Sequence, residues 1–362
     1  MDKLKIVHII QCMAIGGAEK MVLDLAIQSN LKHNVTIVCL YPSGNYPYEK
    51  IAKDSNIKMI FLNKNVGLDL NSFKELWHVL STLQPDVVHT HLHSAIYALP
   101  WLAFNRKNAR IHTVHSIATM EIGKSHRIIQ GLAYKFLGVV PVAISPIIQR
   151  GIIKEYNLKQ KKVPVIYNGI DVAKFPPKIQ GKNNDNFTII NVASFSKWKN
   201  QILLLDAFHI ALKERQDLRL IFVGDGEENG NVQAQASEYK IQDKIEFIGI
   251  TPNVNEYLNR SDVFVLSSTF EGFPLSIIEA MSVGLPIIST DVGGVPDIVK
   301  NGVNGFLVPS NDVIELSNSI LKMANDNNMR GEMSEINIKK SKEFDISIVA
   351  EKYIELYKKW VR

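Results

Sequence analysis

The sequence has no hydrophobic run long enough to span a membrane, and only two cysteines among its 362 residues. A membrane-spanning helix needs about 20 consecutive apolar residues. The longest apolar stretch near the N-terminus, residues 6–10, is interrupted by His8 and preceded by Asp2. We therefore expect neither a membrane-spanning helix nor a secretory signal peptide. Cys12 and Cys39 make no disulfide framework and no metal-ligand set, which favours a reducing, cytoplasmic location.

Acidic residues are scarce in the first half of the chain. Residues 1–168 contain 20 Lys and Arg but 10 Asp and Glu, whereas residues 169–362 contain 21 basic and 26 acidic residues. Nine of the ten histidines also lie in the first half. This asymmetry predicts an anionic partner for the first half; chance and solvated helix faces are the alternative explanation.

Glycine and proline are too few for a low-complexity chain, and short β-branched runs alternate with helical stretches instead. Unbroken Val and Ile runs are typical of strands buried on both faces, and their alternation with helices predicts parallel βαβ units. The fold class is therefore α/β, with one doubly wound domain in each half. The predicted strands are residues 4–10, 35–40, 57–62, 86–91, 110–115, 140–144, 187–193, 218–223, 244–248, 262–266, 286–289 and 305–308.

A polar segment rich in Pro, Gly and Asn, residues 171–186, separates the two predicted domains and is interpreted as a linker. Open parallel sheets bind ligands beyond the carboxyl ends of their strands, so two such domains predict a ligand crevice between them. The C-terminal segment 346–362 is predicted to be an amphipathic helix. Its expected apolar face comprises Ile348, Val349, Tyr353, Leu356 and Trp360.

Two glycines follow the first predicted strand and open a helix. Gly16 and Gly17 would let a backbone approach a phosphate, and the helix N-terminus supplies N–H donors. A tight strand–helix turn explains them equally well. The motif lacks the Gly-x-Gly-x-x-Gly spacing and the following acid of a nicotinamide dehydrogenase.

Histidines gather at the ends of two neighbouring predicted strands. His89, His91 and His93 alternate, which would place all three on one strand face toward the crevice. A metal site is disfavoured, because apart from Asp86 no carboxylate or cysteine cluster nearby completes a ligand set. His112 and His115 end the next strand, where a histidine can act as a donor, a general base or a purely structural residue.

Basic and hydroxyl side chains follow the first strand of the second domain. Ser194, Lys197 and Lys199 precede a helix, where they suit a diphosphate. A basic, solvated loop is an equal explanation. Residues 224–226 form a turn after the next strand that would line the same crevice.

Two carboxylates eight positions apart are the most distinctive feature of the sequence. Glu271 is expected in a loop before a helix that starts near Pro274, and Glu279 about one turn inside that helix. Each carboxylate can bind hydroxyl groups of one polar ligand, while N–H groups between them bind a phosphate. Surface acids are a poor explanation, because apolar residues surround Glu279.

With these motifs in this order, the sequence resembles retaining GT-B glycosyltransferases of family 4 (glycosyl transferases group 1) nearly from end to end. The Glu-x7-Glu element in register with the others is highly specific for that family. The further matching segments are residues 16–19, 86–91, 113–115, 143–145, 167–171, 199–200, 223–226, 247–249, 290–294 and 302–308.

The resemblance implies two Rossmann-like domains facing a central cleft. The final helix would return to the first domain, which then comprises residues 1–170 and 346–362, while residues 187–345 form the domain that binds a nucleotide-diphospho-sugar donor. On the first domain, Gly16 and Gly17 would approach the diphosphate. His115 would face the donor sugar and the acceptor.

On the second domain, the resemblance assigns Glu279 to the ribose and Glu271 to the transferred sugar. Lys199 would hold the diphosphate together with the backbone of the helix start, namely Phe273, Pro274 and Leu275. Ile248 would flank the base. The family usually has Arg where this chain has Ser194, and Lys197 is the neighbouring cation that could replace its charge.

The expected activity is metal-independent transfer of a hexosyl or N-acetylhexosaminyl unit with retention, from a UDP-sugar in preference to a GDP-sugar. The expected acceptor is a saccharide or lipid-linked saccharide in bacterial surface polysaccharide biosynthesis, such as capsule or lipopolysaccharide. No cofactor and no nucleic acid are expected, and the basic half suits an anionic membrane surface at the inner face of the plasma membrane. The alternative is a catalytically weak or inactive subunit that partners an active transferase, which Ser194 favours. The sequence leaves the sugar, base, acceptor and linkage open.

Overall fold

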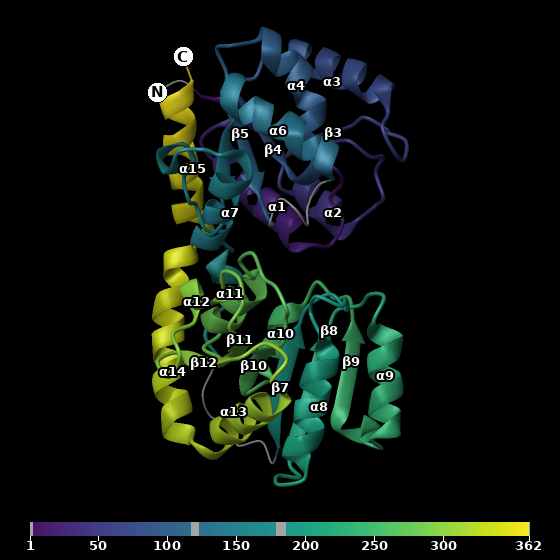
Figure 1. Cartoon of the computed structure of the whole chain (residues 1–362), viewed down its shortest axis with the longest axis vertical. Helices are drawn as coiled ribbons and strands as arrows, with labels where there is room; N and C mark the ends of the chain where they lie inside the picture. Colours follow the sequence, from purple (N-terminus) through teal and green to yellow (C-terminus); the bar gives the residue numbers. More distant parts are fainter. Residues whose placement is uncertain (1–2, 117–122, 179–185, 362) are drawn as a thin grey trace. The chain divides into compact units, whose positions relative to one another are not determined.

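The structure is a computed structural model that describes residues 3–116, 123–178 and 186–361. The chain divides into two compact units, Met1–Ile170 with Ile346–Arg362, and Asp171–Asp345 (Figure 1). In the described part of the chain, no helix combines the length and the apolar character that crossing a membrane requires.

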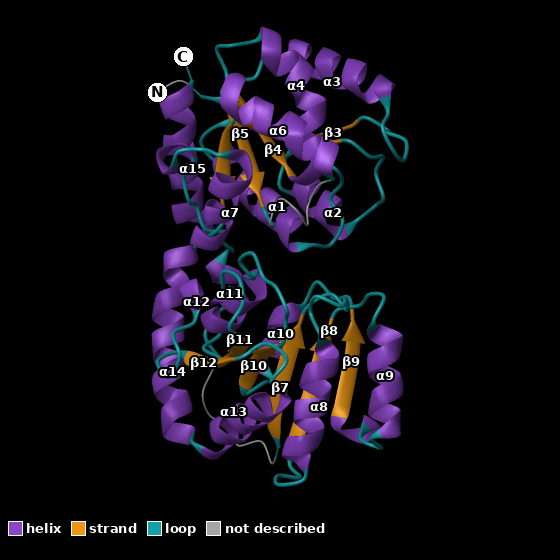
Figure 2. Ribbon diagram, in the orientation of Figure 1, coloured by secondary structure: helices purple, strands orange, loops and turns teal. Residues whose placement is uncertain are grey.

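The first unit contains a six-stranded parallel sheet in the order β3-β2-β1-β4-β5-β6, flanked by helices (Figure 2). Its strands are β1 (Lys5–Ile10), β2 (Asn34–Cys39), β3 (Lys58–Phe61), β4 (Val87–His91), β5 (Ala109–Val114) and β6 (Val140–Ala143). Its helices are α1 (Gly17–Asn30), α2 (Pro47–Asp54), α3 (Leu70–Leu83), α4 (Ala95–Phe104), α6 (Lys124–Phe136), α7 (Pro146–Tyr156) and α15 (Ile346–Trp360).

The second unit repeats this architecture with the order β12-β11-β10-β7-β8-β9. Its strands are β7 (Phe187–Val192), β8 (Leu218–Val223), β9 (Ile245–Gly249), β10 (Val263–Leu266), β11 (Ile287–Thr290) and β12 (Gly305–Val308). Its helices are α8 (Gln201–Leu212), α9 (Asn229–Glu238), α10 (Val254–Asn259), α11 (Leu275–Ser282), α12 (Val295–Ile298), α13 (Val313–Asn325) and α14 (Asn327–Ser341).

The predicted doubly wound fold is confirmed, and each predicted strand lies within one residue of an observed one. The central strands explain why the prediction succeeds. Every residue of β4, β10 and β11 is buried. A strand covered by helices on both faces must be apolar or hydrogen-bonded throughout, so it stands out in the sequence.

Helix α15 lies on the first unit, where Ile346 N–H donates to the carbonyl of Ile170 (2.8 Å). The face expected for it is wrong in part, because Ile348 and Trp360 are exposed. The buried face instead comprises Ile346, Val349, Ala350, Tyr353 and Tyr357. The two tyrosines belong to this face because their hydroxyl groups find buried hydrogen-bond partners on the sheet.

The start of the predicted linker is part of the second unit. The Lys178 N–H donates to the carbonyl of Val283 (2.9 Å), and its ammonium donates to the carbonyl of Ser261 (2.9 Å). These bonds attach the segment to the C-cap residue of α11 and to the turn before β10. Residues 179–185, also assigned to the linker, lie outside the described residues.

The strand order reverses once in each sheet, and this reversal positions the candidate site. In the first unit the reversal lies between β1 and β4, and in the second between β7 and β10. The loops after such a pair of strands diverge to opposite faces of the sheet and leave room for a ligand at the carboxyl edge. The segments singled out from the sequence, at Gly16, His91, Lys199 and Glu271, all follow one of these four strands or end it.

Candidate functional site

Lys199 and Glu271, on the loops after the two strands at the reversal point of the second sheet, form an ion pair with a buried carboxylate. The Lys199 ammonium lies 2.7 Å from Oε1 of Glu271, although 72 residues separate them in sequence. The Ser268 hydroxyl donates to the same oxygen at 2.6 Å. The Glu271 side chain is 6% exposed and that of Lys199 26%. A carboxylate with a charge-assisted bond and a hydroxyl donor is held in one orientation.

The loop that contains Glu271 is also held through its backbone. The Gly294 N–H donates to the carbonyl of Glu271 (3.0 Å). Gly293 has a φ of 57°, and a Cβ atom there would lie 1.7 Å from that carbonyl oxygen. Glycine is therefore required at 293 for both the backbone conformation and the close approach. Ser268, Gly293 and Gly294 were not among the site residues predicted from the sequence.

Hydrogen bonds join the loops after β7 and β10. The Ser267 hydroxyl lies 3.1 Å from the carbonyl of Lys199 and 2.9 Å from that of Asn200. The Thr269 N–H donates to the carbonyl of Trp198 (2.7 Å). Lys199 therefore reaches Glu271 from a backbone that the neighbouring strand holds in place.

Helix α11 starts directly after this loop. Pro274 is the N-cap residue, and Leu275 is the first helical residue. Phe273 is buried and contacts the ring of Phe344 edge-on (5.4 Å between centroids), which anchors the loop. Glu279 lies in the second turn and is half-buried. The helix start therefore lies between the two carboxylates, as the spacing predicts.

The other predicted residues of the second unit lie on loops at the same edge or on an edge strand. Ser194 and Lys197 are exposed in the loop after β7, and Ile248 is half-buried in β9. Cβ atoms at Gly224 and Gly226 would lie 2.0 Å and 2.3 Å from backbone carbonyl oxygens of the same loop after β7. These two glycines thus let the loops after β7 and β8 lie against each other.

In the first unit, Gly16 and Gly17 begin helix α1 as predicted. Gly16 is the N-cap residue in an extended conformation with a φ of −166°, which any residue can adopt. A Cβ atom at Gly17 would meet no described atom within 4 Å. Neither the backbone nor the described surroundings therefore require glycine at position 17.

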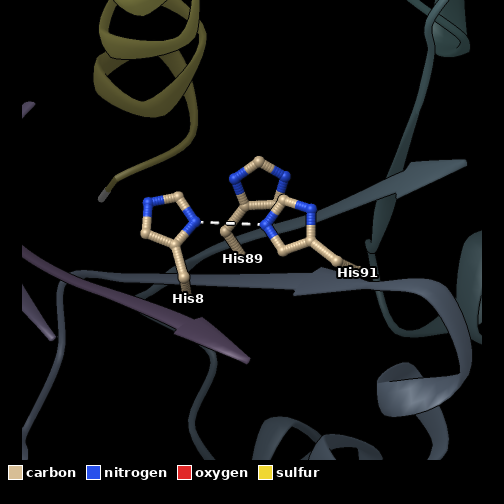
Figure 3. Close-up of side chains that lie close together, drawn as sticks. All are labelled: His8, His89 and His91. Atoms are coloured by element: carbon tan, nitrogen blue, oxygen red, sulfur yellow. Dashed lines mark hydrogen bonds between the residues drawn. The ribbon is translucent and has the colours of Figure 1, made fainter. Parts of the chain in front are cut away.

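The histidines of the first unit form a buried cluster, shown in Figure 3 for His8, His89 and His91. His8 Nδ1 lies 3.1 Å from His91 Nε2, and His91 Nδ1 lies 3.3 Å from His115 Nε2. His89 belongs to a second chain of bonds, with Tyr357 Oη at 2.7 Å from Nδ1 and Thr113 Oγ1 at 2.7 Å from Nε2.

Two expectations about this cluster are wrong. His93 does not share a face with His89 and His91, because the strand ends at His91 and residues Leu92–Ser94 form a 3₁₀ turn that leaves His93 exposed. His89 and His91 do not line an open crevice but are buried, and the His89 ring contacts Tyr357 of α15. His8, on β1, was not predicted. A single histidine within an apolar strand gives no signal that it will meet others.

Burial keeps these imidazoles neutral. It lowers the pKa of His8 and His112 to about 3 and that of His115 to about 4, and it holds the pKa of His89 and His91 well below the usual value of 6.5. Neutral imidazoles are metal ligands, and ring nitrogens of His8, His89 and His91 lie within 4.8 Å of one another. Both nitrogens of His89 and both of His91, however, already make hydrogen bonds.

Two family models match consecutive parts of the chain. The model described as "Glycosyltransferase Family 4" matches residues 15–174, and the model described as "Glycosyl transferases group 1" matches residues 173–340. Together they match the chain from residue 15 to residue 340.

The chain is also similar to curated glycosyltransferases in sequence and to solved structures in fold. An Escherichia coli UDP-Gal:alpha-D-GlcNAc-diphosphoundecaprenol alpha-1,3-galactosyltransferase is 27% identical over 90% of this chain and 89% of its own length. A Bacillus anthracis N-acetyl-alpha-D-glucosaminyl L-malate synthase is 30% identical over 48% of each chain. The structure of Anabaena HepE with UDP-glucose superimposes with a TM-score of 0.85 at 21% identity, over 98% of this chain and all of that one.

Proposed function

Because the chain belongs to the family 4 and group 1 glycosyltransferases and has their GT-B fold, we propose that it transfers a hexosyl or N-acetylhexosaminyl unit from a UDP-sugar with retention of configuration. The proposed acceptor is a lipid-linked saccharide, as in the Escherichia coli relative, whose name specifies a sugar on diphosphoundecaprenol. The proposed role is bacterial surface polysaccharide biosynthesis.

The observation that carries this proposal is the ion pair of Lys199 with Glu271 at the reversal point of the second sheet. We assign Glu271 to the hydroxyl groups of the transferred sugar and Glu279 to those of the ribose. The Lys199 ammonium and the N–H groups at the start of α11 are assigned to the diphosphate. Ser194 and Lys197, in the loop after β7, are assigned to the same diphosphate, and Ile248, in the edge strand β9, to the base.

The chemistry follows from where charge develops. Departure of the nucleoside diphosphate leaves an oxocarbenium-like sugar and places negative charge on the leaving phosphate oxygens. Lys199 and the α11 N-terminus neutralise that charge without a metal ion, and the Glu271 carboxylate stabilises the positive sugar carbon. Because Ser268 and Lys199 already hold one oxygen of Glu271, the carboxylate is oriented before the donor binds.

The test is a donor panel with a diphospholipid-linked GlcNAc acceptor, with product detected by mass spectrometry. Glu271→Gln keeps the side-chain volume but removes the charge, and it is expected to lower kcat at least about 100-fold. Glu246→Gln is the matched control, because Glu246 forms an exposed ion pair with Arg260 in the same unit (2.8 Å). Equal turnover by the Glu271 variant and the wild type would refute the assignment.

We further propose that helix α6 docks the enzyme on an anionic membrane that carries the acceptor. Ile128, Leu132 and Phe136 lie four residues apart on one face and are 62%, 51% and 76% exposed. Residues 101–162, which include α6 and α7, contain 11 Lys and Arg but 2 Asp and Glu. The same helix carries Lys124, Arg127 and Lys135, and exposed apolar side chains on a basic helix favour insertion among anionic headgroups.

Vesicle flotation tests this docking face. The full chain is expected to float with vesicles that contain anionic phospholipid and to remain behind with neutral ones. Leu132→Ser with Phe136→Ser is expected to abolish flotation without changing UDP release on a soluble acceptor. Ile314→Ser, at a similarly exposed residue of the second unit (55%), is the control. Equal flotation by the α6 variant and the wild type would contradict the proposal.

An inactive subunit that partners an active transferase is the second candidate, and exposed Ser194 in place of the usual Arg is the feature that favours it. Calorimetric titration with UDP and GDP distinguishes the two candidates. A competent donor site binds UDP, whereas no binding of either nucleotide at millimolar concentration would favour the inactive subunit.

A further inference from the structure

Three histidines from three neighbouring parallel strands form a continuous chain of hydrogen bonds. His8 on β1 contacts His91 at the end of β4 (Nδ1 to Nε2, 3.1 Å), and His91 contacts His115, directly after β5 (Nδ1 to Nε2, 3.3 Å). His8 is 0% and His91 1% exposed, whereas His115 is half-buried. The chain therefore runs from the interior of the first unit to the residue assigned to the substrates.

Chemistry allows such a chain only two directions. A neutral imidazole has one N–H donor and one lone pair, so each ring must donate on one side and accept on the other. Either every hydrogen bond points from His8 toward His115, or every bond points from His115 toward His8. The choice also decides what the outer nitrogen of His115, Nδ1, offers to a ligand: an N–H in the first case and a lone pair in the second.

The buried end of the chain decides between the two directions. His8 Nε2 is buried and has no hydrogen-bond partner among the described residues. If the bonds pointed toward His8, this atom would be a buried N–H donor without an acceptor, which costs the full desolvation penalty of an unsatisfied donor. If the bonds point toward His115, the same atom is a lone pair without a donor, which costs less.

We propose that the chain is directed from His8 through His91 to His115 and locks His115 in the tautomer with its proton on Nδ1. His115 then donates a hydrogen bond to the substrate and is not the general base. His8 and His91 are positioning residues that act through it. The role of His115 toward a substrate, with a hydroxyl oxygen of the donor sugar as the acceptor of this bond, rests on the proposed function; the tautomer itself does not.

The tautomer is measured directly on the full chain with ¹⁵N-labelled histidine, by long-range ¹H–¹⁵N correlation at pH 7. The ¹⁵N shifts and coupling pattern distinguish a proton on Nδ1 from one on Nε2, and loss of one ring's signals in His115→Gln assigns the residue. We expect the Nδ1–H form of His115 in the absence of any substrate. The Nε2–H form or an imidazolium would overturn the inference, whatever the outcome of the transfer assays.

A substitution at His8, the buried end of the row of hydrogen-bonded histidines, tests whether that row sets the tautomer of His115. His8→Met replaces the donor by a thioether, which can only accept, so the direction is expected to reverse and His115 to shift toward the Nε2–H form. His112→Met is the matched control, because His112 is equally buried on β5 but contacts Thr90 Oγ1 (2.9 Å) outside the chain. An unchanged His115 tautomer in the His8 variant would show that the chain does not control it.

Discussion

The two units share one topology but fill the same position of it with opposite chemistry. Where the strand order reverses, the first unit has neutral histidines that bond to one another, to threonine and to tyrosine. The second unit has a carboxylate paired with an ammonium. The units also differ in overall charge. The first unit, Met1–Ile170 with Ile346–Arg362, contains 24 basic and 12 acidic residues, whereas the second, Asp171–Asp345, contains 17 basic and 24 acidic residues.

The difference shows how the same edge can be built for different tasks. A charged pair presents fixed charge to a ligand, and it tolerates burial because each member neutralises the other. A row of neutral imidazoles presents a donor or an acceptor without a net charge, and it tolerates burial only while it stays unprotonated. The first unit, which contains the histidines, should therefore be much more sensitive to acid than the second unit, which contains the ion pair.

The largest expected effect is that acid destabilises the first unit more than the second. The pKa of His8 and His112 falls from 6.5 in the unfolded chain to about 3 in the fold. Their contribution to stability is complete above pH 6.5 and is lost as the pH falls toward 3, at about 2 kcal/mol each by pH 5. Hydrogen exchange should show β1, β4 and β5 losing protection between pH 6.5 and 5 while β7 and β10 keep theirs; simultaneous loss would remove the contrast between the units.

The next largest effect is expected from a Cβ atom added at Gly293, against the backbone carbonyl of Glu271. Gly293→Ala places a methyl group 1.7 Å from a backbone oxygen in a left-handed conformation, and it should lower the free energy of unfolding by about 3 kcal/mol. Gly302→Ala is the control, because Gly302 has a φ of 74° but open space around it, and it should cost about 1 kcal/mol. Chemical denaturation measures both, and equal losses would contradict the close-approach argument.

Removal of the Lys199 ammonium should have an intermediate effect. Lys199→Met leaves the Glu271 carboxylate buried with the Ser268 hydroxyl as its described donor, which should cost about 2 kcal/mol of unfolding free energy. Lys178→Met is the comparison, because Lys178 is as exposed as Lys199 but pairs with Asp262, whose side chain is 24% exposed. Because water can solvate Asp262, this substitution should cost less free energy of unfolding. The difference between the two midpoints of urea denaturation tests whether burial of the carboxylate matters.

The smallest expected effect concerns position 194, where the family usually has Arg and this chain has Ser. Ser194→Arg adds a guanidinium to an exposed position in the loop after β7 and, if the proposed donor site is correct, should tighten UDP binding about fivefold, or about 1 kcal/mol. Gln242→Arg places the same charge before β9, at the opposite edge of that sheet, and should leave the affinity unchanged. Calorimetric titration measures both; a similar gain in the two variants would indicate a general charge effect.

The fold was predictable because its signal is repeated twelve times in the sequence. Each buried strand is a separate apolar run, and an error in one would not have hidden the alternation. The carboxylates of the site were also predictable, since Glu271 and Glu279 flank a helix start within nine residues. The contacts of Ser268 and Tyr357 were not predictable, because the partner of a hydroxyl group depends on the atom that folding places beside it.

By itself, the sequence determined the class of fold, the strand positions and the residues that carry charge at the carboxyl edge of the second sheet. These are local properties, written in hydrophobic periodicity and in residue type. Only the tertiary structure decided which of them meet: Lys199 with Glu271 across 72 residues, His89 with Tyr357 across 268. A hydrogen bond depends on distances of a few tenths of an ångström between segments far apart in the chain. No local pattern encodes those distances, which is why the histidine chain became visible only in the folded molecule.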